Sequence, residues 1–255
     1  MTRRRRLLGV YVRIGRTYLA WAPSLLLLAA IVFIPLGFAD ALLHQVDTAS
    51  LNVTEGFKLA AFLGALVAVT ASSLFGEVFF SGAVAISLTH PEHEHPPTMR
   101  QIARHISYLK LIAVDLLYVL VILLGLFMFV IGALIFFVYF ALSGAVVELE
   151  KHSVWGGFRR SVQLVRGHFW MVAAVVFPLE IVGDGINEAV VGLSHSLLGH
   201  GILAAWVGES VGNMITAPFF SVAVVLVTLD LIHHRDGNAP ALKQRPQPIV
   251  AAGAA

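Results

Sequence analysis

Residues 111–147 read LIAVDLLYVLVILLGLFMFVIGALIFFVYFALSGAVV, an apolar stretch whose single charged residue is Asp115. A helix that crosses the roughly 30 Å hydrocarbon core of a bilayer needs about 20 apolar residues. One helix through the whole stretch would overshoot the bilayer, so its length predicts two spans that divide between Gly125 and Gly132. The stretch therefore indicates a pair of neighbouring membrane-spanning helices.

The rest of the chain has the same apolar character. Of its 255 residues, 58% are hydrophobic and 13% are charged, and there is no cysteine. This composition excludes a soluble globular domain, in which roughly 25% of residues are charged, and it also excludes disordered and disulfide-stapled proteins. Six runs are long enough to span, at residues 21–43, 58–88, 108–127, 129–147, 169–186 and 213–233. The second run is too long for a straight span, so we expect it to tilt, to break or to begin outside the membrane.

The basic residues test this count independently, because Lys and Arg are enriched in cytoplasmic loops. With six spans and both termini in the cytoplasm, all of the 17 Lys and Arg residues except Lys58 fall on the cytoplasmic side. Five or seven spans would break this pattern. We therefore predict an all-α, polytopic bundle of six transmembrane helices with cytoplasmic termini, located in the cytoplasmic (inner) cell membrane of a bacterium. Its basic loops are expected to face anionic lipid, with no nucleic-acid partner.

The N-terminal region has a second interpretation. A basic stretch and an apolar run precede Ala39-Asp40-Ala41, which imitates a secretory signal peptide with its cleavage site. The apolar run exceeds the ~7–15 residues usual for a signal peptide, which favours an uncleaved first span. On that basis we predict a basic amphipathic interfacial helix at 1–20, a single membrane domain at 21–235 and a flexible cytoplasmic tail at 236–255.

Three cytoplasmic segments end in stretches whose apolar and basic residues fall on opposite helical faces. The apolar positions are Leu7, Tyr11, Ile14, Tyr18 and Trp21 in the first, Ile102, Ile106 and Leu109 in the second, and Trp155, Phe158, Val162, Val165 and Phe169 in the third. The opposite faces hold Arg6, Arg13 and Arg16, then Arg100 and Arg104, then Arg159, Gln163 and Arg166. Such short interfacial helices place arginines against lipid phosphates. They serve either lipid recognition or simple anchoring.

The segment 146–170 carries a more specific pattern: an acidic residue after a span, a small and an apolar residue, Arg-Ser, then Leu, Arg-Gly and Trp. These places are held by Glu150, Gly157, Phe158, Arg160, Ser161, Leu164, Arg166, Gly167 and Trp170. In this pattern the chain resembles a group of six-span bacterial membrane families, among them the membrane domain that precedes some glycerophosphodiester phosphodiesterases. The resemblance implies a six-helix membrane domain whose biochemical role is poorly defined. Because about 20 residues follow the last predicted span, we expect no phosphodiesterase domain here.

Ionisable residues at membrane depth are the main candidates for chemistry, because a charge is costly there. Four carboxylates meet this description: Glu77, Asp115, Glu180 and Asp184. They could pass protons, bind a cation or hold a headgroup, or they could be protonated and hydrogen-bonded across helices as packing contacts. At the inner surface, we expect Arg160 and Arg166 to form ion pairs with the carboxylates Glu148, Glu150 or Asp230.

Metal binding and catalysis have weaker support. His93 and His95 could ligate Zn²⁺ or Ni²⁺, but prolines on both sides keep their loop extended, which favours a solvated linker. The sequence contains no Ser-His-Asp order, His-Glu-x-x-His motif, phosphate-binding glycine loop or cysteine nucleophile. We therefore expect no cofactor and a non-enzymatic protein, and we keep an intramembrane enzyme as a third hypothesis.

Two functional hypotheses come before it. The first is an integral membrane protein that binds the headgroups of anionic lipids, or a partner protein in the membrane. Its candidate contact residues are Arg159, Arg160, Arg166, Arg100 and Arg104. The alternative is a small transporter or permease in which Glu77, Asp115 and Glu180 form a proton or cation path.

Overall fold

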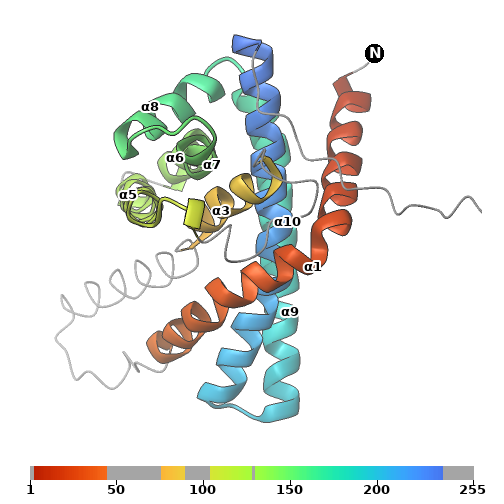
Figure 1. Ribbon diagram of the computed structural model, residues 1–255. Coiled ribbons are helices and arrows are strands. Elements are labelled where there is room, and N and C mark those ends of the chain that lie inside the picture. The colour runs from red at the N-terminus through yellow and green to blue at the C-terminus, as the bar shows by residue number, and fades with distance from the viewer. Residues whose placement is uncertain (1–2, 45–75, 90–103, 128–129, 238–255) are drawn as a thin grey trace, which may run out of the picture.

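The computed structural model describes residues 3–44, 76–89, 104–127 and 130–237, and these ranges contain helices and no strand. The helices are α1 (Arg3–His44), α3 (Glu77–Thr89), α5 (Tyr108–Phe127), α6 (Val130–Phe140), α7 (Ser143–Leu149), α8 (Val154–Val165), α9 (Phe169–Leu198) and α10 (Ile202–Asp236) (Figure 1). The predicted all-α class is confirmed within this part of the chain.

Five described segments are long and apolar enough to cross a membrane: Gly9–Phe38, Tyr108–Leu126, Ile131–Leu149, Phe169–Leu198 and Ile202–Asp236. Of the predicted run 58–88, the described part is α3, whose 13 residues reach only about 20 Å. Gly76, immediately before α3, has a φ of +98°, which no α-helix can accommodate, so the run breaks at this residue. The count of six spans and the cytoplasmic termini stay predictions.

The predicted division between the third and fourth spans is confirmed, because α5 ends at Phe127 and α6 begins at Val130. The two helices approach closely through glycines: a Cβ added to Gly132 would lie 2.9 Å from the carbonyl oxygen of Gly125. In Figure 1, α5 is seen nearly end-on, whereas α9 and α10 run along the picture plane. The α5–α6 pair therefore crosses the α9–α10 pair, and the helices do not all run parallel.

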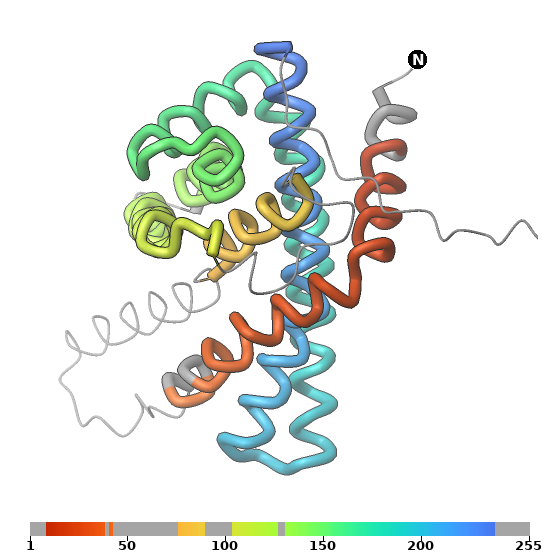
Figure 2. The backbone as a smooth tube through the Cα atoms, viewed as in Figure 1, coloured from red at the N-terminus to blue at the C-terminus, as the bar shows by residue number. Residues whose placement is uncertain are grey.

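α9 and α10 form an antiparallel hairpin, which extends beyond the other described helices at its loop end (Figure 2). These helices have 30 and 35 residues, or about 45 Å and 52 Å, so both overrun the predicted spans 169–186 and 213–233. Asn187 Nδ2 donates to Glu209 Oε2 across the hairpin at 3.0 Å. Because these polar side chains bond to each other, the helices continue through residues at which the apolar runs stop.

α1 is one helix of 42 residues that bends partway along, as expected with Pro23 in its interior (Figure 1). The predicted boundary after residue 20 therefore coincides with no helix end. The face predicted for the membrane surface packs on protein instead. Ile14 and Trp21 are buried, and the Tyr11 hydroxyl donates to the carbonyl oxygen of Ala174 in α9 at 2.6 Å. Side chains of residues 3–8 and all of residues 238–255 lie outside the described part.

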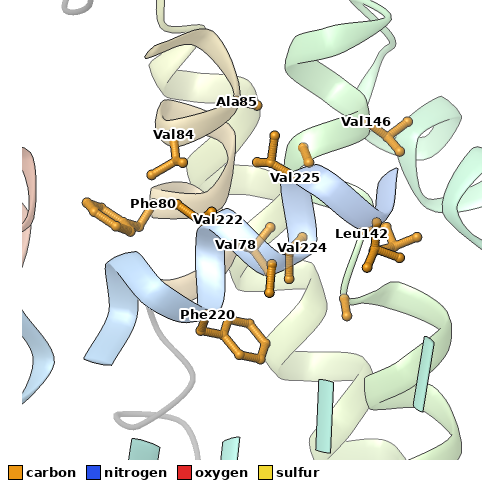
Figure 3. Packing of buried hydrophobic residues seen from close by; sticks show 14 of the residues in the cluster. Val78, Phe80, Val84, Ala85, Leu142, Val146, Phe220, Val222, Val224 and Val225 are labelled. Atoms are coloured by element: carbon orange, nitrogen blue, oxygen red, sulfur yellow. The ribbon is translucent and has the colours of Figure 1, made fainter. Parts of the chain in front are cut away.

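The core lies where α3 meets α7 and α10. Figure 3 shows valine, alanine and phenylalanine side chains from these three helices, and Leu142 just before α7, packed against one another. Gly82 of α3 and Gly144 of α7 face each other, and a Cβ on Gly82 would lie 3.1 Å from the carbonyl oxygen of Gly144. Close approach of helix backbones through small residues is a main source of packing stability inside a membrane. α3 is thus a central element, although it is too short for a span.

Candidate functional site

α8 begins at a defined cap and docks through one face. Ser153 is the N-cap, and its hydroxyl accepts a hydrogen bond from the Gly156 N–H. The Phe158 ring packs on Phe140 of α6, with ring centroids 4.9 Å apart. The Ser161 hydroxyl donates to the carbonyl oxygen of Tyr139 at 2.6 Å. This face therefore packs α8 against the end of α6.

The docked face differs from the predicted one. Trp155, assigned to the apolar stripe, is 72% exposed, whereas Ser161 and Leu164 are buried. The physical reason is Gly157, where a Cβ would overlap Val147 Cγ2 of α7. Because the glycine allows a close approach, α8 turns this side to α7, and Trp155 of the predicted stripe lies outside the contact with protein.

Arg160 anchors the same helix by ion pairs. Its Nε and Nη2 atoms donate to the two carboxylate oxygens of Glu150, each at 2.8 Å, and Nη2 also contacts Asp236 at the end of α10. The Arg160 side chain is only 15% exposed. The hydrogen bonds to Glu150 raise the pKa of Arg160 above its usual value, because they favour the charged guanidinium. Arg160 therefore holds α8 against the end of α7 and against α10.

The other two inner carboxylates are in ion pairs with different partners from those expected. Glu148 Oε2 accepts from Lys151 Nζ at 3.0 Å, and Asp230 Oδ2 accepts from Arg13 Nη2 of α1 at 2.5 Å. Neither pairs with Arg160 or Arg166 in the described part of the chain. The ion pairs thus connect α1 to α10 and α7 to the loop before α8.

Replacing Arg160 by Ala is expected to lower the free energy of unfolding by about 2 kcal/mol, because Glu150 loses two charge-assisted hydrogen bonds. Thermal unfolding in detergent micelles measures this loss. Arg159→Ala is the matched control, because Arg159 is the exposed neighbour on the same helix and should change little. Equal unfolding temperatures for the two variants would contradict the anchoring role.

The opposite side of α8 faces outward. Trp155 and Arg159 are exposed and lie four residues apart on one face of α8, and Arg166, the residue that caps the end of α8, is exposed as well. Trp170, at the start of α9, is 74% exposed. We call these four residues the outer surface of α8. It combines two aromatic and two cationic side chains, which are the residue types that prefer the membrane–water interface.

The second predicted interfacial helix does not continue to Leu109 in the described residues. The chain leaves helical geometry at Ile106 and Ser107, because the Ser107 N–H donates to Glu148 Oε1 at 2.9 Å and turns the chain into α5. Ile106 is then buried, whereas Leu109 is 85% exposed, so they do not share one face. Arg104 is exposed, and Arg100 lies outside the described residues.

The predicted metal ligands His93 and His95 lie outside the described residues, because they belong to residues 90–103. Among the residues that the structure does describe, there is no group of three His, Cys, Asp or Glu side chains placed to hold a metal ion.

Asp115 has a structural partner. Its Oδ2 accepts from the Gly76 N–H at 2.6 Å and its Oδ1 from the Val78 N–H at 3.1 Å. The first N–H groups of a helix have no partner within the helix, and they carry the positive end of its dipole. Asp115 of α5 thus caps α3 from outside. Its place in the predicted path of three acids stays a prediction.

Glu77 and Glu180 are brought together by the fold, although 102 intervening residues separate them in the sequence. Glu77 begins α3 and Glu180 lies within α9, and their carboxyl groups are close enough to act on each other electrostatically. Asp184, one turn further along α9, is exposed but close enough to act electrostatically on Glu77. The sequence indicates the depth of each acid and carries no signal for this pairing.

These features define a class, an all-helical protein whose long apolar helices fit a membrane-embedded bundle. A particular family cannot be assigned by comparison, because no family model matches the chain and no curated protein or solved structure matches it.

Proposed function

We propose that this is a non-enzymatic integral membrane protein that binds the headgroups of anionic lipids through the outer surface of α8. The observation that carries the proposal is the exposed pair Arg159 and Arg166 flanked by the exposed indoles of Trp155 and Trp170. Indole rings settle at headgroup level. Guanidinium groups bind phosphate oxygens through paired hydrogen bonds.

The structure changes which arginines the proposal uses. Arg160 was a candidate for lipid contact, but Glu150 and Asp236 already occupy its guanidinium group. Arg159 and Arg166 are exposed and form no ion pair with described residues. The proposal therefore assigns headgroup contact to Arg159 and Arg166 and assigns anchoring to Arg160.

The family resemblance fits the same proposal. Among the residues that carry it, Glu150 and Arg160 form the ion pair that anchors α8. Gly157, Phe158, Ser161 and Leu164 form the face through which α8 docks. We propose that this pattern marks a docked interfacial helix in the six-span bacterial families as well. The corresponding location is the cytoplasmic side of a bacterial cell membrane.

Replacing both Arg159 and Arg166 by Gln should weaken retention of anionic lipid roughly 30-fold, because each basic residue near an anionic surface contributes about 1 kcal/mol. Native mass spectrometry of protein released from nanodiscs counts the retained lipids. Nanodiscs of phosphatidylglycerol and of phosphatidylcholine distinguish charge-dependent retention from general lipid adhesion.

The matched control is Arg16→Gln with Lys110→Gln, which removes the same charge from exposed residues outside α8. Retention in this control should stay near that of the unmodified protein. Unchanged retention in the α8 variant, or an equal loss in the control, would overturn the proposal.

A further inference from the structure

Both helices of the α9–α10 hairpin contain a proline in their interior, Pro178 in α9 and Pro218 in α10. Proline has no N–H group, so the carbonyl oxygen four residues earlier loses its donor within the helix. In α9 this carbonyl oxygen belongs to Ala174. In a transmembrane helix, a neighbouring helix commonly supplies the missing donor, because the hydrocarbon core holds no water that could do so.

α1 supplies this donor to α9. The Tyr11 hydroxyl donates to the carbonyl oxygen of Ala174 at 2.6 Å, and this is the oxygen that Pro178 leaves without its donor within the helix. The two residues are 163 positions apart in the sequence, so the bond joins distant parts of the chain. The position of α1 and the bend of α9 at Pro178 are therefore linked through one hydrogen bond.

Tyr18, two turns further along α1, lies at the corresponding turn of α10. Its hydroxyl is 3.5 Å from the carbonyl oxygen of Ile215, three residues before Pro218. Its ring packs edge-on against Phe219, with ring centroids 5.6 Å apart. The same stretch of α1 thus contacts the proline-containing turn in both helices of the hairpin.

Further contacts hold α1 to α10 on both sides of the bend in α1. Before the bend, Arg13 Nη2 donates to Asp230 Oδ2 at 2.5 Å. α1 then changes direction, with Pro23 in its interior (Figure 2). Beyond the bend, Trp206 Nε1 donates to the carbonyl oxygen of Ile34 at 2.9 Å. The first part of α1 therefore lies along the hairpin as a strap, which we define as residues 9–21.

We propose that this strap sets the bend of α9, and that Tyr11 is the positioning residue through which it does so. While the Tyr11 hydroxyl pairs with Ala174, the bend at Pro178 is fixed. When the strap moves away, the carbonyl oxygen is unpaired and α9 takes up a different bend. Trp170 lies eight residues before Pro178 in the same helix. The strap therefore also positions this indole, and only that consequence rests on the proposed function.

Distances between spin labels test the proposal in nanodiscs of phosphatidylcholine, which contain no anionic lipid. The chain has no cysteine, so Trp170→Cys with Glu188→Cys places one label on each side of Pro178. Both positions are exposed, and they lie 18 residues, or about 27 Å, apart. Tyr11→Phe removes only the hydroxyl. A change in bend of about 20° moves these labels by roughly 3 Å, and we expect a shift of this size.

Two controls distinguish a change in bend from a general loss of stability. Tyr108→Phe removes the hydroxyl of an exposed tyrosine in α5 and should leave the distance unchanged. Pro178→Ala restores a donor to Ala174 within the helix, so Tyr11→Phe added to this variant should cause no further shift. An unchanged distance in Tyr11→Phe alone, or an equal shift with and without Pro178, would overturn the proposal. Because anionic lipid is absent, failure of the lipid-binding proposal leaves this result unaffected.

Discussion

Replacing Gly144 by Ala is expected to destabilise the protein by about 3 kcal/mol, the upper end of the range for overpacked cores. Gly144 lies in α7 at its crossing with α3. A Cβ at this position would overlap the carbonyl oxygen of Val78 and come within 2.7 Å of Ser81 Oγ. The carbonyl oxygen belongs to the backbone of α3 and cannot rotate away as a side chain does, so the two helices must separate.

The opposite side of this crossing explains why separation is costly. Gly82 of α3 lies against both neighbouring helices, because a Cβ there would lie 3.1 Å from the carbonyl oxygen of Gly144 in α7 and 2.5 Å from Leu111 Cδ2 of α5. Within a bilayer, helices associate through close packing because lipid tails are as apolar as the side chains. A shift of α3 away from α7 therefore loses packing contacts, and inside the bilayer no hydrophobic driving force compensates for that loss.

Thermal unfolding in detergent micelles measures the effect of Gly144→Ala. Gly185→Ala is the matched control, because Gly185 lies within α9 and an added Cβ would have no atom within 4 Å. Ala favours a helix over Gly by up to about 1 kcal/mol, so the control should unfold at the same or a slightly higher temperature. Equal destabilisation of both variants would show that the α3–α7 contact is not tight.

Replacing Asp115 by Ala should cost about 3–5 kcal/mol. The substitution leaves the N–H groups of Gly76 and Val78 without an acceptor in a buried environment, and each unsatisfied group costs about 1–3 kcal/mol. Asp115→Asn keeps one carbonyl oxygen as an acceptor, so its loss should be roughly half as large. The effect should concentrate at the first turn of α3, which Asp115 caps.

Hydrogen exchange followed by mass spectrometry locates the effect, because amides that lose their cap exchange faster. The expected result is faster exchange at the start of α3 and a smaller change in exchange elsewhere. Asp184→Ala serves as the control, since Asp184 is an exposed carboxylate and accepts no hydrogen bond that the structure records. If exchange at α3 is the same in Asp115→Ala as in the unmodified protein, the capping role is wrong.

The division at Gly125 to Gly132 and the helical class were predictable from the sequence for a local reason. Whether an apolar run fits a bilayer depends on its length and composition, which are properties of the run alone. The ends of α9 and α10 were not predictable in the same way. The runs stop at polar residues such as Asn187, but the helix continues because Glu209 of the other helix bonds to it.

The predicted interfacial stretches also show that helical spacing in the sequence does not by itself determine which face of a helix docks. Helical spacing placed Trp155 with the apolar residues of α8, yet the helix docks through the side that Gly157 leaves open to Val147. Ser107 ends a helical turn because Glu148 accepts its N–H. In both places, a contact with a distant segment overrides the local pattern.

The sequence by itself determined that this chain is helical and apolar enough for a membrane, and it identified the charged residues that need an explanation there. The tertiary structure alone decided their roles. Arg159 is exposed while its neighbour Arg160 is held by Glu150 and Asp236, and Asp115 caps α3 while Glu77 lies near the carboxyl group of Glu180. The physical reason is that the state of a charged group depends on the atoms within a few ångströms of it, and the fold brings those atoms from distant parts of the chain.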